Sequence, residues 1–220
     1  MQHDPDELEE MGATYNPAIG MSCRSEADRI KKIVQGLKQG YGPVCVRFLA
    51  ENMTPSEAGA VLDFGCGIGG TTGAVHVRAL RKLGYDCTGY EWEPEDDDES
   101  GRAETYDWAI EEELIDPEAL DTAWDVVIAN NVLNIQPSWD AMRLTLKDMK
   151  ACMDSDTLLL VNMPSSPRRV IADGADGLDE THELLDASFG CIVELEPGLW
   201  ACYRPRPMSP KRWKVLVGGL

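Results

Sequence analysis

The sequence lacks any apolar run near the roughly 20 residues that a membrane-spanning helix needs, and it lacks a surplus of basic residues. Its 220 residues include 20 Lys+Arg against 39 Asp+Glu, which gives a formal net charge of −19. Phosphate backbones repel so acidic a chain, which disfavours nucleic-acid binding without excluding it. Because 43% of the residues are hydrophobic, the chain is too apolar for disorder, and we expect a folded protein.

Patterns typical of metal sites, disulfide frameworks and serine hydrolases are also missing. The seven cysteines are odd in number and unpatterned, and the three histidines show no metal-ligand spacing. Gly-x-Ser-x-Gly does not occur. We therefore expect no metal site and reduced thiols, as in a cytoplasmic protein. We interpret His76 as an ordinary residue in the middle of a helix, at the surface or partly buried.

Composition divides the chain into three parts. Residues 1–22 form an acidic segment interrupted by proline and glycine, which predicts a flexible leader. Residues 23–204 carry the strand and helix patterns of a single domain. Residues 205–220 form a basic tail, in which Arg206, Lys211, Arg212 and Lys214 surround Trp213. Such a tail can grip a nucleic-acid strand, but we favour a solvated segment that offsets the acidic body.

Buried strands alternate with helices along the central part of the chain. Continuous apolar runs at 60–64, 124–130 and 157–162 predict strands covered on both faces. Helical spacing predicts helices at 22–39, 44–53, 71–83 and 182–188, and a core-facing helix from Trp139 to Met153. Residues 54–56 are expected to be a loop. The fold class predicted is α/β: a doubly wound, Rossmann-like, mostly parallel sheet in three layers, with an antiparallel C-terminal hairpin.

The most informative stretch follows the first of these strands. It reads Asp63-Phe64-Gly65-Cys66-Gly67-Ile68-Gly69, with a strand before it and a predicted helix after it. Glu91 ends the next strand, where a carboxylate can accept hydrogen bonds from a ribose diol. An acid directly before the glycines would repel a pyrophosphate, but it suits a ligand that carries an amino group and a sulfonium.

This stretch resembles motif I of the class I S-adenosylmethionine-dependent methyltransferases, Asp-x-Gly-x-Gly-x-Gly. Residues 83–91 are similar to the segment of that family that ends in its ribose-binding acid, and residues 124–130 to its fourth strand. The resemblance covers residues 24–204 and implies S-adenosylmethionine as cofactor. The residues that it implies at the methionine end of the cofactor are Asp63, Gly65, Gly67 and Gly69. It implies that Glu91 holds the ribose.

Two further implications concern the base and the acceptor. The family's third-strand residue, which contacts adenine, has no clear match here, and both Tyr106-Asp107-Trp108 and Ile115-Asp116 are candidates. The resemblance places Asn130 at the cofactor and opens the fourth strand onto the methyl acceptor, which makes Asn131 and Asn134 candidate catalytic residues. Asparagine also favours turns that follow strands, so a purely structural role for these two is equally weighted.

The segment Asn131-Val132-Leu133-Asn134-Ile135 is similar to a signature of methyltransferases carried by phages and DNA-modification gene clusters. The motifs of ordinary amino-directed and cytosine-C5 base methylation are missing. Three functions remain: a methyltransferase acting on a small-molecule or protein acceptor, which we favour, one acting on nucleic acid in a phage or DNA-modification pathway, and a cofactor-binding module without activity.

Overall fold

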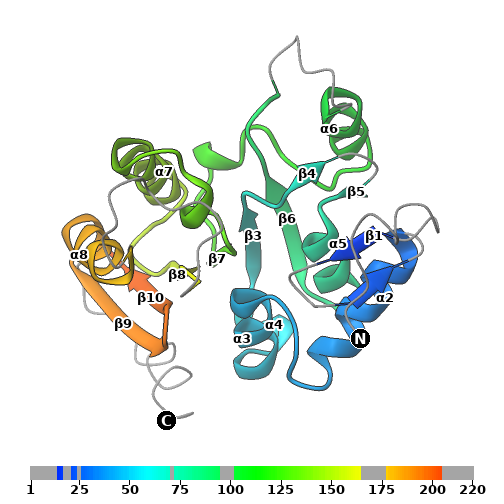
Figure 1. Ribbon diagram of the computed structural model, residues 1–220, viewed down its shortest axis with the longest axis horizontal. Coiled ribbons are helices and arrows are strands. Elements are labelled where there is room, and N and C mark those ends of the chain that lie inside the picture. Colours follow the sequence, from blue (N-terminus) through cyan, green and yellow to red (C-terminus); the bar gives the residue numbers. More distant parts are fainter. Residues whose placement is uncertain are drawn as a thin grey trace.

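A computed structural model describes residues 14–16, 21–23, 26–69, 72–94, 102–164 and 177–204. Its centre is a six-stranded sheet with the strand order β6-β3-β7-β8-β10-β9 (Figure 1). The first four strands in this order are parallel, whereas β10 runs antiparallel to both β8 and β9. The strands are β3 (Ala60–Phe64), β6 (Asp86–Tyr90), β7 (Val126–Ala129), β8 (Leu158–Asn162), β9 (Cys191–Glu196) and β10 (Leu199–Tyr203).

Helices cover both faces of this sheet (Figure 1). Successive residues of a strand point to opposite faces, so Val61 joins the core under one helical layer and Leu62 the core under the other. One layer holds α2 (Glu26–Leu37), α3 (Val44–Asn52) and α5 (Val75–Lys82), and the other holds α7 (Trp139–Ala151) and α8 (Gly177–Phe189). The predicted three-layer α/β fold with an antiparallel C-terminal hairpin is confirmed.

The helix α7 shows why helices could be predicted from the spacing of apolar residues in the sequence. Ser138 caps its first turn, because the Ser138 side chain accepts a hydrogen bond from the backbone N–H of Ala141. Met142, Leu146 and Met149 lie three and four residues apart and are buried against the sheet. The prediction that this stripe is a core face is confirmed.

The loop predicted at residues 54–56 is instead the start of a one-turn helix, α4 (Pro55–Ala58). A capping box forms it, in which the Thr54 backbone N–H donates to the Glu57 carboxylate at 2.8 Å. Proline at the first helical position favours the same conformation. A loop was the wrong prediction because proline begins a helix as readily as it ends one.

The helix after the glycines also begins later than residue 71. Two short strands, β4 (Ile68–Gly69) and β5 (Thr72–Gly73), pair antiparallel before α5 begins at Val75. Glycine and threonine are poor helix formers, and helix α6 (Arg102–Glu111) packs against this hairpin. A Cβ atom on Gly73 would lie 3.0 Å from the Trp108 ring, so a larger residue there would require the indole to shift.

The sheet extends beyond β6 by one residue pair. Gly89 and Ile115 form a parallel bridge, in which the Gly89 N–H donates to Leu114 and the Asp116 N–H donates to Gly89. The chain continues through a 3₁₀ turn, η1 (Ala119–Asp121), into β7. A single bridge therefore stands where the resemblance implies a third strand.

Part of the predicted leader is paired. β1 (Thr14–Asn16) and β2 (Met21–Cys23) form a two-stranded antiparallel ladder. The remainder of segment 1–22 and the basic tail 205–220 lie outside the described residues, so the domain boundaries stay predictions. None of the helices in the described ranges is long and apolar enough to cross a membrane.

Candidate active site

The glycine turn after β3 is built by two glycines with different tasks. Gly65 and Gly67 have φ values of 67° and 78°, in the left-handed region that favours glycine. A Cβ on Gly65 would lie 2.8 Å from a methyl group of Val132, so this position serves close packing. A Cβ on Gly67 would meet nothing within 4 Å, so this position faces open space. The turn therefore presents bare backbone at Gly67 to a ligand.

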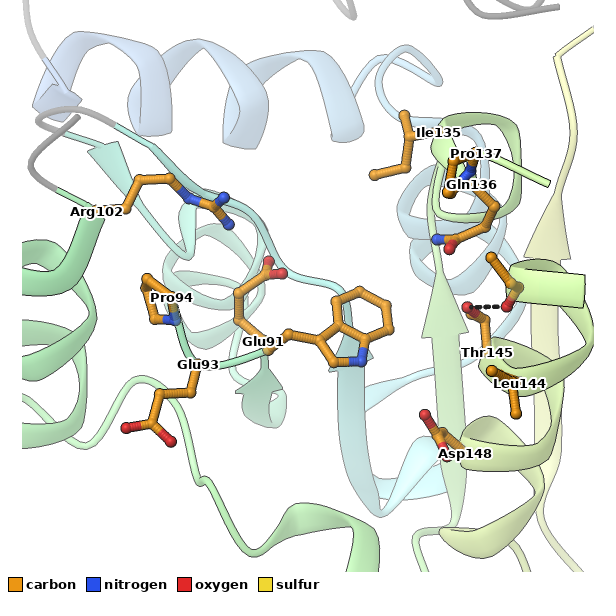
Figure 2. A pocket seen from close by; sticks show the side chains of 12 residues that line it. Glu91, Glu93, Pro94, Arg102, Ile135, Gln136, Pro137, Leu144, Thr145 and Asp148 are labelled. Atoms are coloured by element: carbon orange, nitrogen blue, oxygen red, sulfur yellow. Dashed lines mark hydrogen bonds between the residues drawn. The ribbon is translucent and has the colours of Figure 1, made fainter. Parts of the chain in front are cut away.

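Two cavities, of about 840 and 360 Å³, lie near this turn: the turn itself lines the smaller one, and Glu91, which is hydrogen-bonded to Gly67, lines the larger one. Volumes of this size are typical of sites for small molecules and cofactors. In Figure 2, Glu91, Pro94 and Arg102 form one wall of the larger cavity, and Ile135, Thr145 and Asp148 lie across from them. Ile135, in the 3₁₀ turn η2 (Leu133–Ile135), lines both cavities and is half exposed. The residues that line the smaller cavity are Arg29, Gly65, Cys66, Gly67, Ile68, Val75, His76, Asn130, Asn131 and Ile135.

Glu91 lies where β6 ends, at the junction of the turn and the larger cavity. Its carboxylate accepts a hydrogen bond of 2.8 Å from the Gly67 backbone N–H. Burial raises the pKa of Glu91, and the backbone N–H groups of Gly67 and Trp92 and the positive charge of Arg102 oppose that rise. The predicted ribose-binding acid is thus fixed against the glycine turn with one edge toward the cavity.

Trp92 lines the larger cavity beside Glu91, and our reading of the sequence missed it. Its ring packs edge-on against Phe64, with ring centroids 5.4 Å apart, and it also contacts Tyr90 at 5.9 Å. These contacts hold the indole in one orientation. An aromatic residue next to the predicted ribose-binding acid was the available signal for this wall of the cavity.

Neither predicted adenine-contacting segment lines either of these two cavities. Residues 106–108 belong to α6, which packs on the β4–β5 hairpin. Ile115 forms the bridge to β6, and the Asp116 carboxylate accepts a hydrogen bond from the Glu118 backbone N–H at 2.9 Å. The adenine assignment therefore stays open for both segments.

The loop after β7 is held by a network of buried side chains. Asn131 adopts a φ of 61°, and its backbone N–H donates to the Asn162 side chain at 2.8 Å. The Asn162 amide returns a hydrogen bond of 2.9 Å to the Asn131 side chain. The Asn130 side-chain oxygen accepts from the Cys45 backbone N–H at 3.1 Å. Because this oxygen is engaged, Asn130 has its amide N–H₂ to offer a ligand.

The two candidate catalytic asparagines are placed differently. Asn131 lines the smaller cavity, but its side chain is engaged with Asn162. Asn134 is 7% exposed and does not line either cavity, and its side-chain oxygen has no hydrogen-bond partner within the described part of the chain. The structure brings Asn131 to the smaller cavity and places Asn134 within the η2 turn, away from both cavities.

The buried Asp63 and the partly buried His76 form a pair that the sequence did not reveal. Asp63 is 1% exposed, and the His76 Nδ1 atom lies 3.6 Å from its carboxylate. His76 lines the smaller cavity, because α5 begins at Val75 and so places His76 in its first turn. We expected a mid-helix residue because we began the helix at Thr71. The glycine- and threonine-rich run before Ala74 was the signal that the helix begins later.

The buried thiols are unsuited to nucleophilic chemistry. Burial raises the pKa of the Cys45 and Cys66 thiols, and it raises that of Cys152 to about 12. Six cysteines within the described ranges are free, and all of these except Cys191 are buried. Those ranges also hold no group of three His, Cys, Asp or Glu residues that could bind a metal ion.

A known family has this combination of fold and site. The family model described as "Methyltransferase domain" matches residues 39–205, which is most of the chain. The chain therefore belongs to the methyltransferase domain family, and S-adenosylmethionine is its methyl donor.

Solved structures are similar to this chain at low sequence identity. DesVI of Streptomyces venezuelae is 12% identical, with a TM-score of 0.54, and the match covers 93% of this chain and 100% of that one. A TehB-like SAM-dependent methyltransferase from Corynebacterium glutamicum is 12% identical, with a TM-score of 0.49 and coverage of 82% and 98%. No curated protein matches the sequence significantly.

Proposed function

We propose that S-adenosylmethionine lies across the two cavities, with its adenosine in the larger one and its methionine part in the smaller one. The observation that carries this proposal is that the Gly65–Gly67 turn lines the smaller cavity, that Glu91, which is hydrogen-bonded to Gly67, lines the larger one, and that Ile135 is common to both. A ligand that fills both can pass Gly67, where a Cβ would meet nothing within 4 Å. S-Adenosylmethionine has two such parts joined at the sulfonium.

At the adenosine end, Glu91 accepts hydrogen bonds from the ribose hydroxyls and Trp92 packs against the base. Support comes from the burial of Glu91 and from its anchoring to Gly67. The Trp92 indole borders the same cavity, held by Phe64 and Tyr90. Stacking of a base on an aromatic ring contributes about 1–3 kcal/mol.

At the methionine end, we assign the glycine turn, Asp63 and Asn130 to the cofactor. Gly65, Gly67 and Asn130 line the smaller cavity, and Gly69 follows in β4. Asn130 offers its amide N–H₂ because Cys45 occupies its oxygen. Asp63 lies beneath the turn rather than at the cavity, so its contribution passes through a neighbouring group.

The bound cofactor supplies a methyl group that the sulfonium already activates, so the protein's task is alignment and the exclusion of water. Asn131 and Asn134 remain our candidates for orienting the acceptor, at the loop that joins the cavities. Asn131 acts from a strained position fixed by Asn162. Asn134 acts from the turn that carries Ile135.

For the acceptor we favour a small molecule or a protein side chain. Two exposed apolar residues, Ile135 and Leu144, line the larger cavity, while the chain as a whole carries a charge of −19. Apolar contacts suit such acceptors, and the acidic charge opposes a phosphate backbone. The buried free thiols support a reducing, cytoplasmic location.

The alternative is a nucleic-acid acceptor in a phage or DNA-modification pathway. The resemblance of residues 131–135 supports it, together with the basic tail, which lies outside the described residues. Salt-dependent retention on DNA separates the two, since a DNA-acting enzyme loses affinity steeply as salt rises. A cofactor-binding module without activity would bind S-adenosylmethionine and never methylate any extract.

The test of the cofactor site is calorimetric titration of the purified chain with S-adenosylmethionine and, separately, with NAD. We expect binding of the first and none of the second, and a loss on Glu91→Gln. A matched control is Glu93→Gln, which alters the next acid along the same cavity wall. Tighter binding of NAD would overturn the proposal.

A further inference from the structure

Asp63 carries a buried carboxylate, and the cofactor proposal does not say which group balances its charge. It is 1% exposed, and neither of its oxygens has a hydrogen-bond partner among the residues that the structure describes. An ionised carboxylate in such surroundings is costly unless a cation pairs with it. Burial raises the pKa of the neighbouring Cys45 and Cys87 thiols, and the negative charge of Asp63 raises it further. Those neighbours are neutral, so they leave the carboxylate uncompensated.

His76 is the group placed to compensate it. Its Nδ1 atom is 3.6 Å from the Asp63 carboxylate, within ion-pair range and longer than a hydrogen bond. His76 borders the smaller cavity with its side chain 16% exposed, whereas Asp63 does not reach the cavity. The imidazole ring therefore stands between the buried carboxylate and the space that a ligand would fill. With Nδ1 facing Asp63, the Nε2 edge remains for the ligand.

The groups beside His76 define what such a ligand carries. Arg29 on α2 and the amide N–H₂ of Asn130 border the same cavity. With His76 they make three hydrogen-bond donors on this cavity, and the side chains of His76 and Arg29 can carry positive charge. Donors that line one cavity suit a carboxylate, which accepts several hydrogen bonds at once. The methionine part of S-adenosylmethionine ends in a carboxylate.

We propose that His76 binds the carboxylate of the cofactor's methionine part through Nε2, and that Asp63 is a positioning residue that holds the imidazole rather than a direct ligand. This inference rests on the proposed function. It names His76 as the neighbouring group through which Asp63 acts, in place of the direct contact with the cofactor that the sequence predicts. The nearby imidazole also gives Asp63, whose oxygens have no hydrogen-bond partner among the described residues, a polar neighbour beneath the turn.

The first experiment compares two ligands that differ in the amino-acid part. S-Adenosylhomocysteine carries the carboxylate, and 5′-methylthioadenosine lacks it. His76→Ala should weaken S-adenosylhomocysteine about 10- to 100-fold, as expected for hydrogen bonds to charged groups, and change methylthioadenosine less than about twofold. His76→Gln, which keeps a donor on the side chain, should recover part of the loss. The matched control His182→Ala alters an exposed histidine on α8 and should change neither.

The second experiment tests the indirect role of Asp63. Asp63→Asn should weaken S-adenosylhomocysteine in the wild-type background and cause no further loss in the His76→Ala background. Thermal unfolding of each variant checks that the fold persists. If Asp63→Asn does not fold, the ligand comparison on His76→Ala and His76→Gln decides the proposal alone.

The outcomes separate this inference from the function beneath it. If the wild-type chain binds neither S-adenosylmethionine nor S-adenosylhomocysteine, the cofactor site itself is wrong. If the wild type binds but His76→Ala weakens both test ligands equally, or weakens neither, only the role of His76 is wrong. If Asp63→Asn causes its full loss in the His76→Ala background, Asp63 contacts the cofactor directly.

Discussion

Asn162 offers a demanding test of how the site is held together, because it touches neither the cofactor turn nor the solvent. The side chain is 2% exposed at the end of β8. Its oxygen accepts from the Asn131 backbone N–H at 2.8 Å and from the Cys45 thiol at 3.5 Å, and its amide donates to the Asn131 side chain at 2.9 Å. Replacing it should release the loop that borders both cavities.

The magnitude follows from these contacts. Asn162→Ala removes two hydrogen bonds of normal length and leaves partners in a part-buried site, at about 1–2 kcal/mol each. We therefore expect the free energy of unfolding to fall by about 2–4 kcal/mol. Asn162→Asp keeps the shape, but its second oxygen would face the Asn131 oxygen and bury a charge. It should destabilise at least as much as alanine.

The assay is urea unfolding followed by circular dichroism, combined with calorimetric titration of S-adenosylmethionine. Asn52→Ala is a matched control, because Asn52 makes one part-buried hydrogen bond, to the Phe48 carbonyl within α3. It should cost about 1 kcal/mol or less and leave cofactor affinity unchanged. If Asn162→Ala unfolds like the wild type and binds the cofactor equally well, the network does not hold the loop.

Three more changes probe other parts of the site. Glu91→Gln should weaken the binding of S-adenosylmethionine by about 1–3 kcal/mol. Because burial raises the pKa of Glu91, the affinity of the wild type should also fall as the pH is lowered through that raised pKa. Calorimetry should find this pH dependence of affinity flattened in the variant. Gly65→Ala should lower stability to urea more than Gly67→Ala, since both strain the backbone but only the first meets Val132; equal losses would contradict this. Trp92→Ala should weaken cofactor binding, measured by titration, by about 1–3 kcal/mol. An unchanged affinity would show that the adenine base does not pack against Trp92.

Much of the fold could be predicted because burial and periodicity were unambiguous. The strand β3 was predicted at residues 60–64, and it spans Ala60–Phe64, because each residue after Ala60 is buried. The predicted helix from Trp139 to Met153 is α7, since its apolar residues share one face. For such segments the local pattern and the packing agree, so no tertiary information is needed.

The β4–β5 hairpin could not be predicted in the same way. Its strands are two residues long and carry no alternating pattern, and α6, far along the chain, packs against them. The role of His76 depended on this hairpin, because it delays the start of α5 and brings His76 to the cavity. The place of Trp92 in the cavity wall could not be predicted either. The cavity is formed only when η2 and α7 lie opposite Trp92 in the folded chain.

The candidate site followed the same division. Glu91 and the glycine turn are motif positions in one short stretch and its neighbouring strand, and the structure places them side by side through the Gly67–Glu91 hydrogen bond. The Asn131–Asn162 network joins residues 31 apart in sequence, and no local pattern marks it. Pairings of this kind come from strand order, which local sequence does not encode.

A crystal structure of the chain with S-adenosylhomocysteine tests the central claim most directly. We expect the adenosine in the larger cavity, with its ribose on Glu91 and its base beside Trp92, and the amino-acid part passing over Gly67 into the smaller cavity. A ligand lying elsewhere, or a homocysteine part in the larger cavity with the base beside Asn130, would contradict the account.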